Sequence, residues 1–150
     1  MKFFKTILIT FIFLTCSVKA DLNNNLINEL KQGGKLIFIR HAYAPGNGDP
    51  QNFNLYDCST QRNLSENGRE QSKKIGNLFF ENNIDIENVY SSEWCRCKET
   101  ASIAFKNFKT KTFLNSFYSS QFAKNKQKQI KEFQEFINNW DKKGNLVFVT

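Results

Sequence analysis

A short apolar run, Leu36 to Ile39, most constrains what this chain can fold into. The run is continuous rather than alternating, and it lies between the pair Gly33-Gly34 and the charged residue Arg40. A continuous run of this length is typical of a strand that is covered on both faces, as in a parallel sheet flanked by helices. The sequence therefore predicts an α/β sheet whose first strand is buried.

Helical and strand-like patterns alternate along the rest of the chain. This alternation predicts a three-layer α/β sandwich, in which right-handed crossovers connect a mostly parallel sheet between helices. The 150 residues fit one domain, and no internal repeat is present. The expected helices span residues 22–31, 66–79, 95–105 and 126–140, and the expected strands span 35–39, 89–91, 110–114 and 146–149.

A long loop is expected at 42–61, because this stretch holds both prolines and has no hydrophobic period. Loops of this length in compact domains usually carry function. Ser65 is expected to cap the helix that follows, and the small residues Gly68 and Ser72 are expected to let this helix approach the sheet closely. The helix over 126–140 is expected to turn one apolar stripe inward: Ile130, Phe133, Ile137 and Trp140.

The first twenty residues are typical of a secretory signal peptide rather than of a folded domain. Two lysines precede an apolar run that is shorter than the ~20 residues of a membrane-spanning helix, and Val18-Lys19-Ala20 offers small residues at the cleavage site. We expect residues 1–20 to be removed and residues 21–150 to form the domain, in the periplasm or secreted. A retained anchor and a lipid on Cys16 are weaker alternatives.

The charge of the chain favours small anionic partners. Removal of residues 1–20 takes away three lysines and no acid, which lowers the formal net charge from +7 to +4. The lysines between Lys124 and Lys131 are separated by Gln and Asn on a predicted helix, which indicates a solvated face rather than a nucleic-acid site. We expect no nucleic-acid partner, and the mildly basic field favours small anions instead. We also expect no stable membrane span after signal cleavage, because the apolar run is too short to cross a bilayer.

Three cysteines would remain after cleavage: Cys58, Cys95 and Cys97. Thiols tend to pair in an oxidising compartment, so we expect Cys58 to bond with Cys95 or Cys97 and one thiol to stay free. Because the last two cysteines flank Arg96, the bond is expected to hold this arginine in place. A three-thiolate metal site is the rival, but Cys-x-Cys with one distant Cys is not a regular zinc spacing. We expect no metal and no cofactor.

Charged and polar residues follow the predicted strands at their carboxyl ends, where open α/β sheets bind ligands. The first strand ends in Arg40-His41, and Ser91-Ser92 and Arg96 follow the second. Arginine side chains match phosphate oxygens two at a time and stay charged at any working pH. The sequence therefore predicts a phosphate site at this edge of the sheet.

Three stretches occur in an order that resembles one known family. The first strand runs into Arg40-His41-Ala42, residues 62–71 open the next helix, and residues 91–101 place serine, arginine and threonine around Arg96. Together they resemble the motifs of the histidine phosphatase superfamily, also called phosphoglycerate-mutase-like, with Ala42 in place of the usual glycine. The resemblance extends over residues 35–101 and implies the fold of that superfamily.

The resemblance also implies a reaction and its residues. His41 would attack phosphorus and form a phosphohistidine that water hydrolyses, while Arg40 and Arg96 hold the non-bridging oxygens. Neighbouring cations would keep the imidazole unprotonated and therefore nucleophilic. Arg62 would be a third phosphate ligand, and Asn47 would supply a polar contact to the substrate.

The chain departs from the family pattern in two places. Members place a second histidine directly after a strand like 146–149, whereas this sequence has one histidine and ends within that strand at Thr150. We therefore expect a C-terminally truncated domain and a full-length product that continues with histidine. The comparable stretch for a proton donor, 113–118, has no carboxylate, and neither Asp57 nor Glu93 is assigned that role.

The sequence thus predicts a phosphomonoesterase that acts outside the cytoplasm on a small or glycan-borne phosphate. A non-catalytic anion-binding pseudoenzyme, or an inactive fragment without the second histidine, is the alternative. A phosphomutase is disfavoured because its substrates are mostly cytoplasmic.

Overall fold

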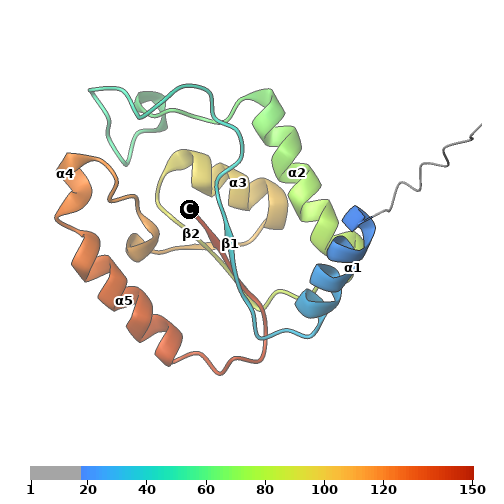
Figure 1. Ribbon diagram of the computed structural model, residues 1–150. Coiled ribbons are helices and arrows are strands. Elements are labelled where there is room, and N and C mark those ends of the chain that lie inside the picture. The colour runs from blue at the N-terminus through green and yellow to red at the C-terminus, as the bar shows by residue number, and fades with distance from the viewer. Residues whose placement is uncertain (1–17) are drawn as a thin grey trace, which may run out of the picture.

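A computed structural model of the protein describes residues 18–150. Four parallel strands form one sheet in the order β1-β4-β2-β3, which confirms the expected α/β class. Figure 1 shows helices around this central sheet. Most of the predicted signal peptide, including Cys16, lies outside the described residues. The strands are β1 (Leu36–Ile39), β2 (Asn88–Ser91), β3 (Lys109–Thr110) and β4 (Leu146–Val149).

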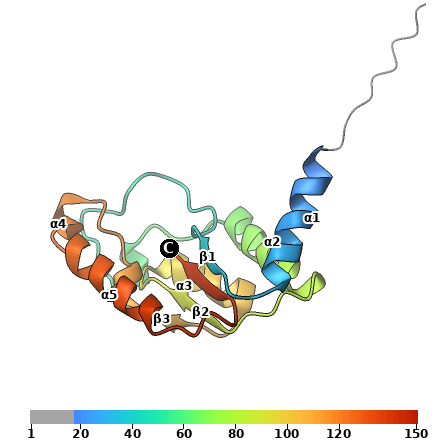
Figure 2. The same cartoon turned by 60° about the horizontal axis from the view of Figure 1, so that its bottom comes forward.

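Helices lie on both sides of this sheet, as Figure 2 shows. The first three helices pack on one face and the last long helix packs on the other, which makes three layers. No described helix is long and apolar enough to cross a membrane. The helices are α1 (Val18–Lys31), α2 (Glu66–Glu81), α3 (Cys95–Phe105), α4 (Ser120–Ala123) and α5 (Lys126–Asn138), with short 3₁₀ turns at Cys58–Thr60 and Thr112–Leu114.

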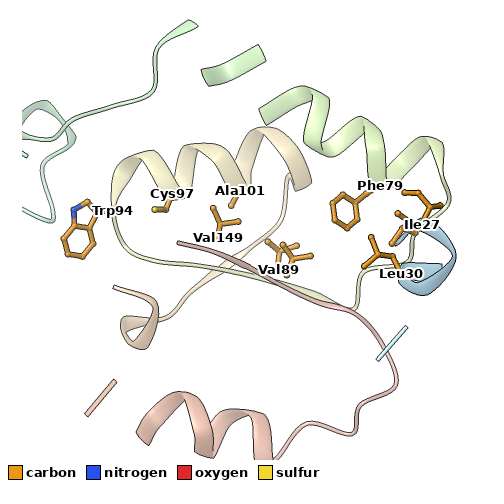
Figure 3. Packing of buried hydrophobic residues seen from close by; sticks show 10 residues of the cluster. Ile27, Leu30, Phe79, Val89, Trp94, Cys97, Ala101 and Val149 are labelled. Carbon is orange, nitrogen blue, oxygen red and sulfur yellow. The ribbon is translucent and has the colours of Figure 1, made fainter. Parts of the chain in front are cut away.

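The core is organised around β4, which pairs with β1 on one side and with β2 on the other. Alternate side chains of β4 point to opposite faces. Val147 and Val149 join the cluster under α1, α2 and α3, where Figure 3 shows Val149 close to Ala101 of α3. Phe148 points to the other face and packs against α5. All four residues of β4 are buried, so this strand is the centre of both cores.

Strand β1 is an edge strand, and the prediction that it is covered on both faces is wrong. Its residue Phe38 is 55% exposed. The ring of Phe38 still lies 5.1 Å from that of Phe148 and 5.6 Å from that of Phe133, measured between centroids. The apolar run predicted a strand correctly, but a run of residue types does not record how many neighbouring strands it has. The strand that is buried on both faces is β4.

Helix α5 turns part of the predicted stripe inward, but not Ile130. Ile130 is 37% exposed, whereas its neighbour Gln129 is buried. The side-chain amide of Gln129 donates a hydrogen bond of 2.9 Å to the carbonyl of Thr112. Phe133 and Trp140 pack on the sheet as expected. The helix is thus rotated so that a polar side chain with a backbone partner takes the inner position, which hydrophobic spacing does not reveal.

The third strand is shorter than predicted, because only Lys109–Thr110 pairs before the 3₁₀ turn at Thr112–Leu114.

Helix α2 begins as predicted, because the Ser65 hydroxyl accepts a hydrogen bond of 3.2 Å from the N–H of Gly68. The small residues of α2 approach a loop and α3, however, and not the sheet. A Cβ atom on Gly68 would lie 2.1 Å from the carbonyl oxygen of Tyr43, and one on Gly76 would lie 2.3 Å from that of Ala104. Gly68 thus lets α2 lie directly against the segment that leaves β1, and Gly76 lets it lie against α3.

The substitution Gly68→Ala should therefore destabilise the protein. Alanine is the better helix former, so propensity alone predicts a gain of up to about 1 kcal/mol. The clash with the Tyr43 carbonyl should outweigh this gain and lower the free energy of unfolding by about 1–3 kcal/mol. Urea unfolding measures the change, with Asn67→Ala on the exposed side of the same turn as the control. A Gly68→Ala protein as stable as the wild type would contradict this close packing.

Candidate active site

A cavity of about 1500 Å³ opens at the carboxyl ends of β1, β4 and β2. Parallel strands bring these ends to one edge of the sheet, and the loop over 42–61 arches past this edge in Figure 2. Residues that follow each strand reach the cavity, namely His41 after β1, Thr150 after β4 and Ser92 after β2. The structure brings all five predicted site residues to its lining: Arg40, His41, Asn47, Arg62 and Arg96.

The main chain and one side-chain hydrogen bond set the orientation of His41. Its N–H donates to the carbonyl of Thr150 at 2.7 Å, which continues the β1–β4 ladder by one residue. Its ring Nδ1 lies 2.8 Å from the carbonyl oxygen of Ala42. A carbonyl oxygen only accepts hydrogen bonds, so Nδ1 carries the proton in the neutral ring. The other ring nitrogen, Nε2, therefore holds a lone pair that is available to attack an electrophile.

The surroundings of His41 keep its ring neutral. Burial lowers the pKa of His41 below its ordinary value of 6.5, although the hydrogen bond to Ala42 acts in the opposite direction. The positive charges of Arg96, Arg62 and Arg40 lower this pKa further. The arginines that suit a phosphate group thus also disfavour a charged imidazole.

Arg96 lies in the first turn of α3 and is buried, with 8% of its surface exposed. Its Nη1 atom donates to the Asp49 carboxylate at 2.7 Å and, more weakly, to the carbonyl of Arg62 at 3.4 Å. Its Nε atom is buried and has no hydrogen-bond partner within residues 18–150. The protein therefore holds one side of this guanidinium and leaves the other side unpaired.

Arg62 uses two of its three guanidinium nitrogens to bind the loop that precedes it. Its Nε atom donates to the carbonyl of Gly48 at 3.0 Å, and its Nη1 atom donates to the carbonyl of Ala44. Its main-chain N–H donates to the carboxylate of Asp49 at 3.1 Å. Gly48 has a φ of +68°, a conformation that favours glycine. Arg62 thus wraps the loop around its own side chain, and Nη2 is the one guanidinium nitrogen without a loop partner.

Arg40 and Asn47 are both exposed at the cavity. Neither side chain makes a hydrogen bond or an ion pair within the part of the chain that the structure describes. Both side chains are therefore free to contact a ligand, and their predicted roles as phosphate and substrate contacts remain predictions.

Asp49 is the functional residue that sequence reasoning missed. Its carboxylate accepts hydrogen bonds from Arg96, from the N–H of Arg62 and from the indole N–H of Trp94, the last at 3.1 Å. Burial alone would raise the pKa of Asp49, but these hydrogen bonds outweigh burial and lower it. Among the described residues, it is the one acidic side chain that lines the cavity. Its position in a long polar loop gave no local pattern by which to single it out.

A disulfide joins Cys58 to Cys95, and Cys97 stays a free, buried thiol. The structure thus has one of the two pairings that the sequence left open. The bond ties the long loop to the first residue of α3, directly before Arg96, as the predicted clamp requires. It also uses two of the three sulfurs that a thiolate metal site would need. Burial raises the pKa of the Cys97 thiol, which keeps it protonated and unreactive.

The family model of the histidine phosphatase superfamily (branch 1) matches residues 36–145. The chain belongs to this superfamily. The match begins at the first residue of β1 and includes His41, Arg62 and Arg96.

Two curated proteins share part of this superfamily domain. A 2,3-bisphosphoglycerate-dependent phosphoglycerate mutase from Arthrobacter sp. (strain FB24) is 34% identical over 70 residues, and a phosphoglycerate mutase from Candida albicans is 31% identical over 70 residues. Each match covers 47% of this chain but 27% of the relative. The matched stretch thus spans about a quarter of the length of these relatives.

Two solved structures show a similar fold. The protein histidine phosphatase SixA complexed with tungstate superimposes with a TM-score of 0.53 at 14% identity, over 77% of this chain and 67% of that one. A putative α-ribazole-5′-P phosphatase from Escherichia coli gives 0.55 at 14% identity, over 77% and 72%. These likenesses confirm the phosphoglycerate-mutase-like architecture that the motifs predict.

The low pKa of His41 predicts how a histidine phosphatase with this site responds to pH. Only a neutral imidazole can act as a nucleophile, so a nucleophilic role for His41 predicts that kcat/KM falls only below a pKa that lies under 6.5. Because the Arg40 cation lowers this pKa, Arg40→Gln should shift the acid limb to higher pH. An NMR titration of the His41 ring, with a pH–rate profile beside it, measures both effects. A wild-type pKa above 6.5 would contradict the electrostatics of this site.

Proposed function

We propose that this protein is a phosphatase that hydrolyses a phosphomonoester through a phosphohistidine at His41. The observation that carries the proposal is that His41, whose Nδ1 is committed to the carbonyl of Ala42 and whose pKa is lowered, lines the same cavity as three arginines. A lone pair and several fixed cations are what transfer of a phosphoryl group requires.

The reaction has two displacements. Nε2 of His41 attacks phosphorus, the ester P–O bond breaks, and its electron pair leaves with the alcohol oxygen, which takes up a proton. Water then attacks the same phosphorus and the P–N bond breaks. The neutral ring is restored and inorganic phosphate is released. Arg40 and Arg96 hold the non-bridging oxygens through both steps.

Asp49 is poorly suited to protonate the leaving alcohol. Its carboxylate already accepts three hydrogen bonds, and its lowered pKa keeps it ionised. Neither Asp57 nor Glu93 lines the cavity. Asp57 accepts hydrogen bonds from Ser59, and the Glu93 carboxylate accepts one of 2.6 Å from Asn115. The proton donor is therefore not among the carboxylates of the described residues.

The remaining lining of the cavity supports a leaving group with a ring. Aromatic side chains stand beside amides and hydroxyls, a combination that suits the apolar faces and the hydroxyl groups of a sugar. A small or glycan-borne sugar phosphate fits this wall. The residues concerned are Phe53, Phe113, Phe117, Tyr118, Asn115 and Ser116.

A second candidate is an anion-binding protein without catalytic activity. The three arginines that line the cavity support it, because they would hold a phosphate group whether or not His41 attacks it. A phosphate group would then sit on the same arginines without forming a bond to His41.

Hydrolysis of a generic aryl phosphate by the purified full-length protein separates these candidates. We expect phosphate release, and a loss of about 10³-fold or more in kcat/KM for His41→Asn, because no other group replaces the nucleophile. Arg69→Gln is the control, since Arg69 pairs with Glu99 and Glu66 away from the cavity. Absence of release, or an unchanged rate in His41→Asn, would reject the phosphatase.

We also propose that the protein works outside the cytoplasm. The disulfide between Cys58 and Cys95 supports this location, because such bonds persist in oxidising compartments. The basic and apolar residues before Ala20 support export.

Fractionation of a Gram-negative host tests the proposed location. The exported protein should start at Asp21 by mass spectrometry and should carry an oxidised Cys58. A charge in the apolar run, Leu8→Arg, should block export and leave residues 1–20 attached. Wild-type protein that stays in the cytoplasm with its leader intact would show that the proposed location is wrong.

A further inference from the structure

The Asp49 carboxylate links α3 to the segment that precedes α2. Hydrogen bonds reach it from α3 through Arg96, from the segment before α2 through the N–H of Arg62, and from the indole of Trp94. The ion pair with Arg96 is the most enclosed one that the described residues make, since the two side chains are 9% and 17% exposed. Trp94 is 3% exposed, so its indole is itself held firmly.

Only one of the three guanidinium nitrogens of Arg96 is hydrogen-bonded within the described residues. Asp49 and the carbonyl of Arg62 take Nη1. Nε is buried without a partner, and Nη2 makes no hydrogen bond within residues 18–150. The Nε and Nη2 atoms share one edge of the planar group, the edge that binds two oxygens of a phosphate at once.

We infer that Asp49 is a positioning residue, which holds Arg96 by Nη1 so that its Nε–Nη2 edge is presented to the phosphate group of the substrate. This role rests on the proposed phosphatase function and adds to it a residue that never touches the substrate. A buried donor such as Nε is costly while it lacks a partner, and a phosphate oxygen supplies that partner.

An opposite role for Asp49 is that of a plug, which occupies Arg96 until a phosphate displaces it. The contacts disfavour this role, because a plug must leave and Asp49 is tied by the main chain of Arg62 and by Trp94 as well as by Arg96. The carboxylate also takes Nη1 alone and leaves the two-donor edge without a hydrogen-bond partner. The net charge of the cavity also favours the positioning role. Its three arginines and one aspartate sum to two positive charges, which matches a doubly charged phosphate ester with Asp49 in place.

The two roles predict opposite effects of Asp49→Asn on the affinity for inorganic phosphate. Removal of a negative charge beside an anion site should by itself tighten phosphate binding. Loss of the charged hydrogen bond that orients Arg96 should instead weaken it by roughly 10- to 100-fold. Calorimetry with inorganic phosphate on the full-length protein measures the dissociation constant directly. Weaker binding supports positioning, and unchanged or tighter binding overturns it.

Asp57→Asn is the matched control, because Asp57 lies in the same loop but outside the cavity, and its carboxylate accepts hydrogen bonds only from Ser59. Its phosphate affinity should equal that of the wild type. If Asp49→Asn does not fold, Asp49→Glu replaces it: the charge stays but the carboxylate moves, so phosphate binding should again weaken. Wild-type affinity in Asp49→Glu would overturn the inference.

A second measurement separates positioning from a merely structural role. In an Arg96→Gln background the additional change Asp49→Asn should alter phosphate affinity by less than about 3-fold, because no guanidinium remains to be oriented. The same loss in both backgrounds would overturn the inference. Hydrolysis reports separately on the proposed function: a wild type that binds phosphate without hydrolysing its esters rejects the phosphatase, while the binding data still decide the role of Asp49.

Discussion

The hydrogen bonds that β4 makes to β1 and β2 hold two parts of the site together. One part is the Arg40-His41 segment after β1, and the other is the segment from Ser92 to Arg96 after β2. Beyond the strand ends the ladder continues, because the N–H of His41 donates to Thr150 and the N–H of Ser92 donates to Val149. Residues that are far apart in sequence therefore meet at one sheet edge by main-chain geometry alone. The complete burial of β4 makes this arrangement costly to disturb, since its side chains belong to both cores.

A loop of twenty residues would by itself be too mobile to position a substrate, and three kinds of bond restrain it here. The disulfide ties Cys58 to α3, the guanidinium of Arg62 holds two loop carbonyls, and Asp49 pairs with Arg96. Each restraint ends at or beside an arginine that lines the cavity. Pre-ordered cations are what lower the barrier to phosphoryl transfer, because they need not reorganise as charge moves. In this protein the loop is thus as much a part of the arginine site as the sheet is.

The parts of this structure that follow local rules could be predicted from the sequence. Ser65 caps α2 through a contact three residues away, and α3 begins at Cys95 where the pattern changes. The features that depend on distant partners were not predictable. Phe38 is exposed because β1 has one neighbouring strand, and Gln129 is buried because a carbonyl in another turn accepts its hydrogen bond. Asp49 matters for a similar reason, since its partners come from later segments of the chain.

The central claim is that His41 itself becomes phosphorylated. Rapid quenching of the full-length protein with a phosphomonoester, followed by mass spectrometry and phosphorus NMR, tests it most directly. The structure predicts an acid-labile phosphoryl group on Nε2 of His41, since Nδ1 is committed to the carbonyl of Ala42. The group should be absent from His41→Asn. Steady hydrolysis with no phosphoryl group on His41, or with the group on another side chain, would contradict this account.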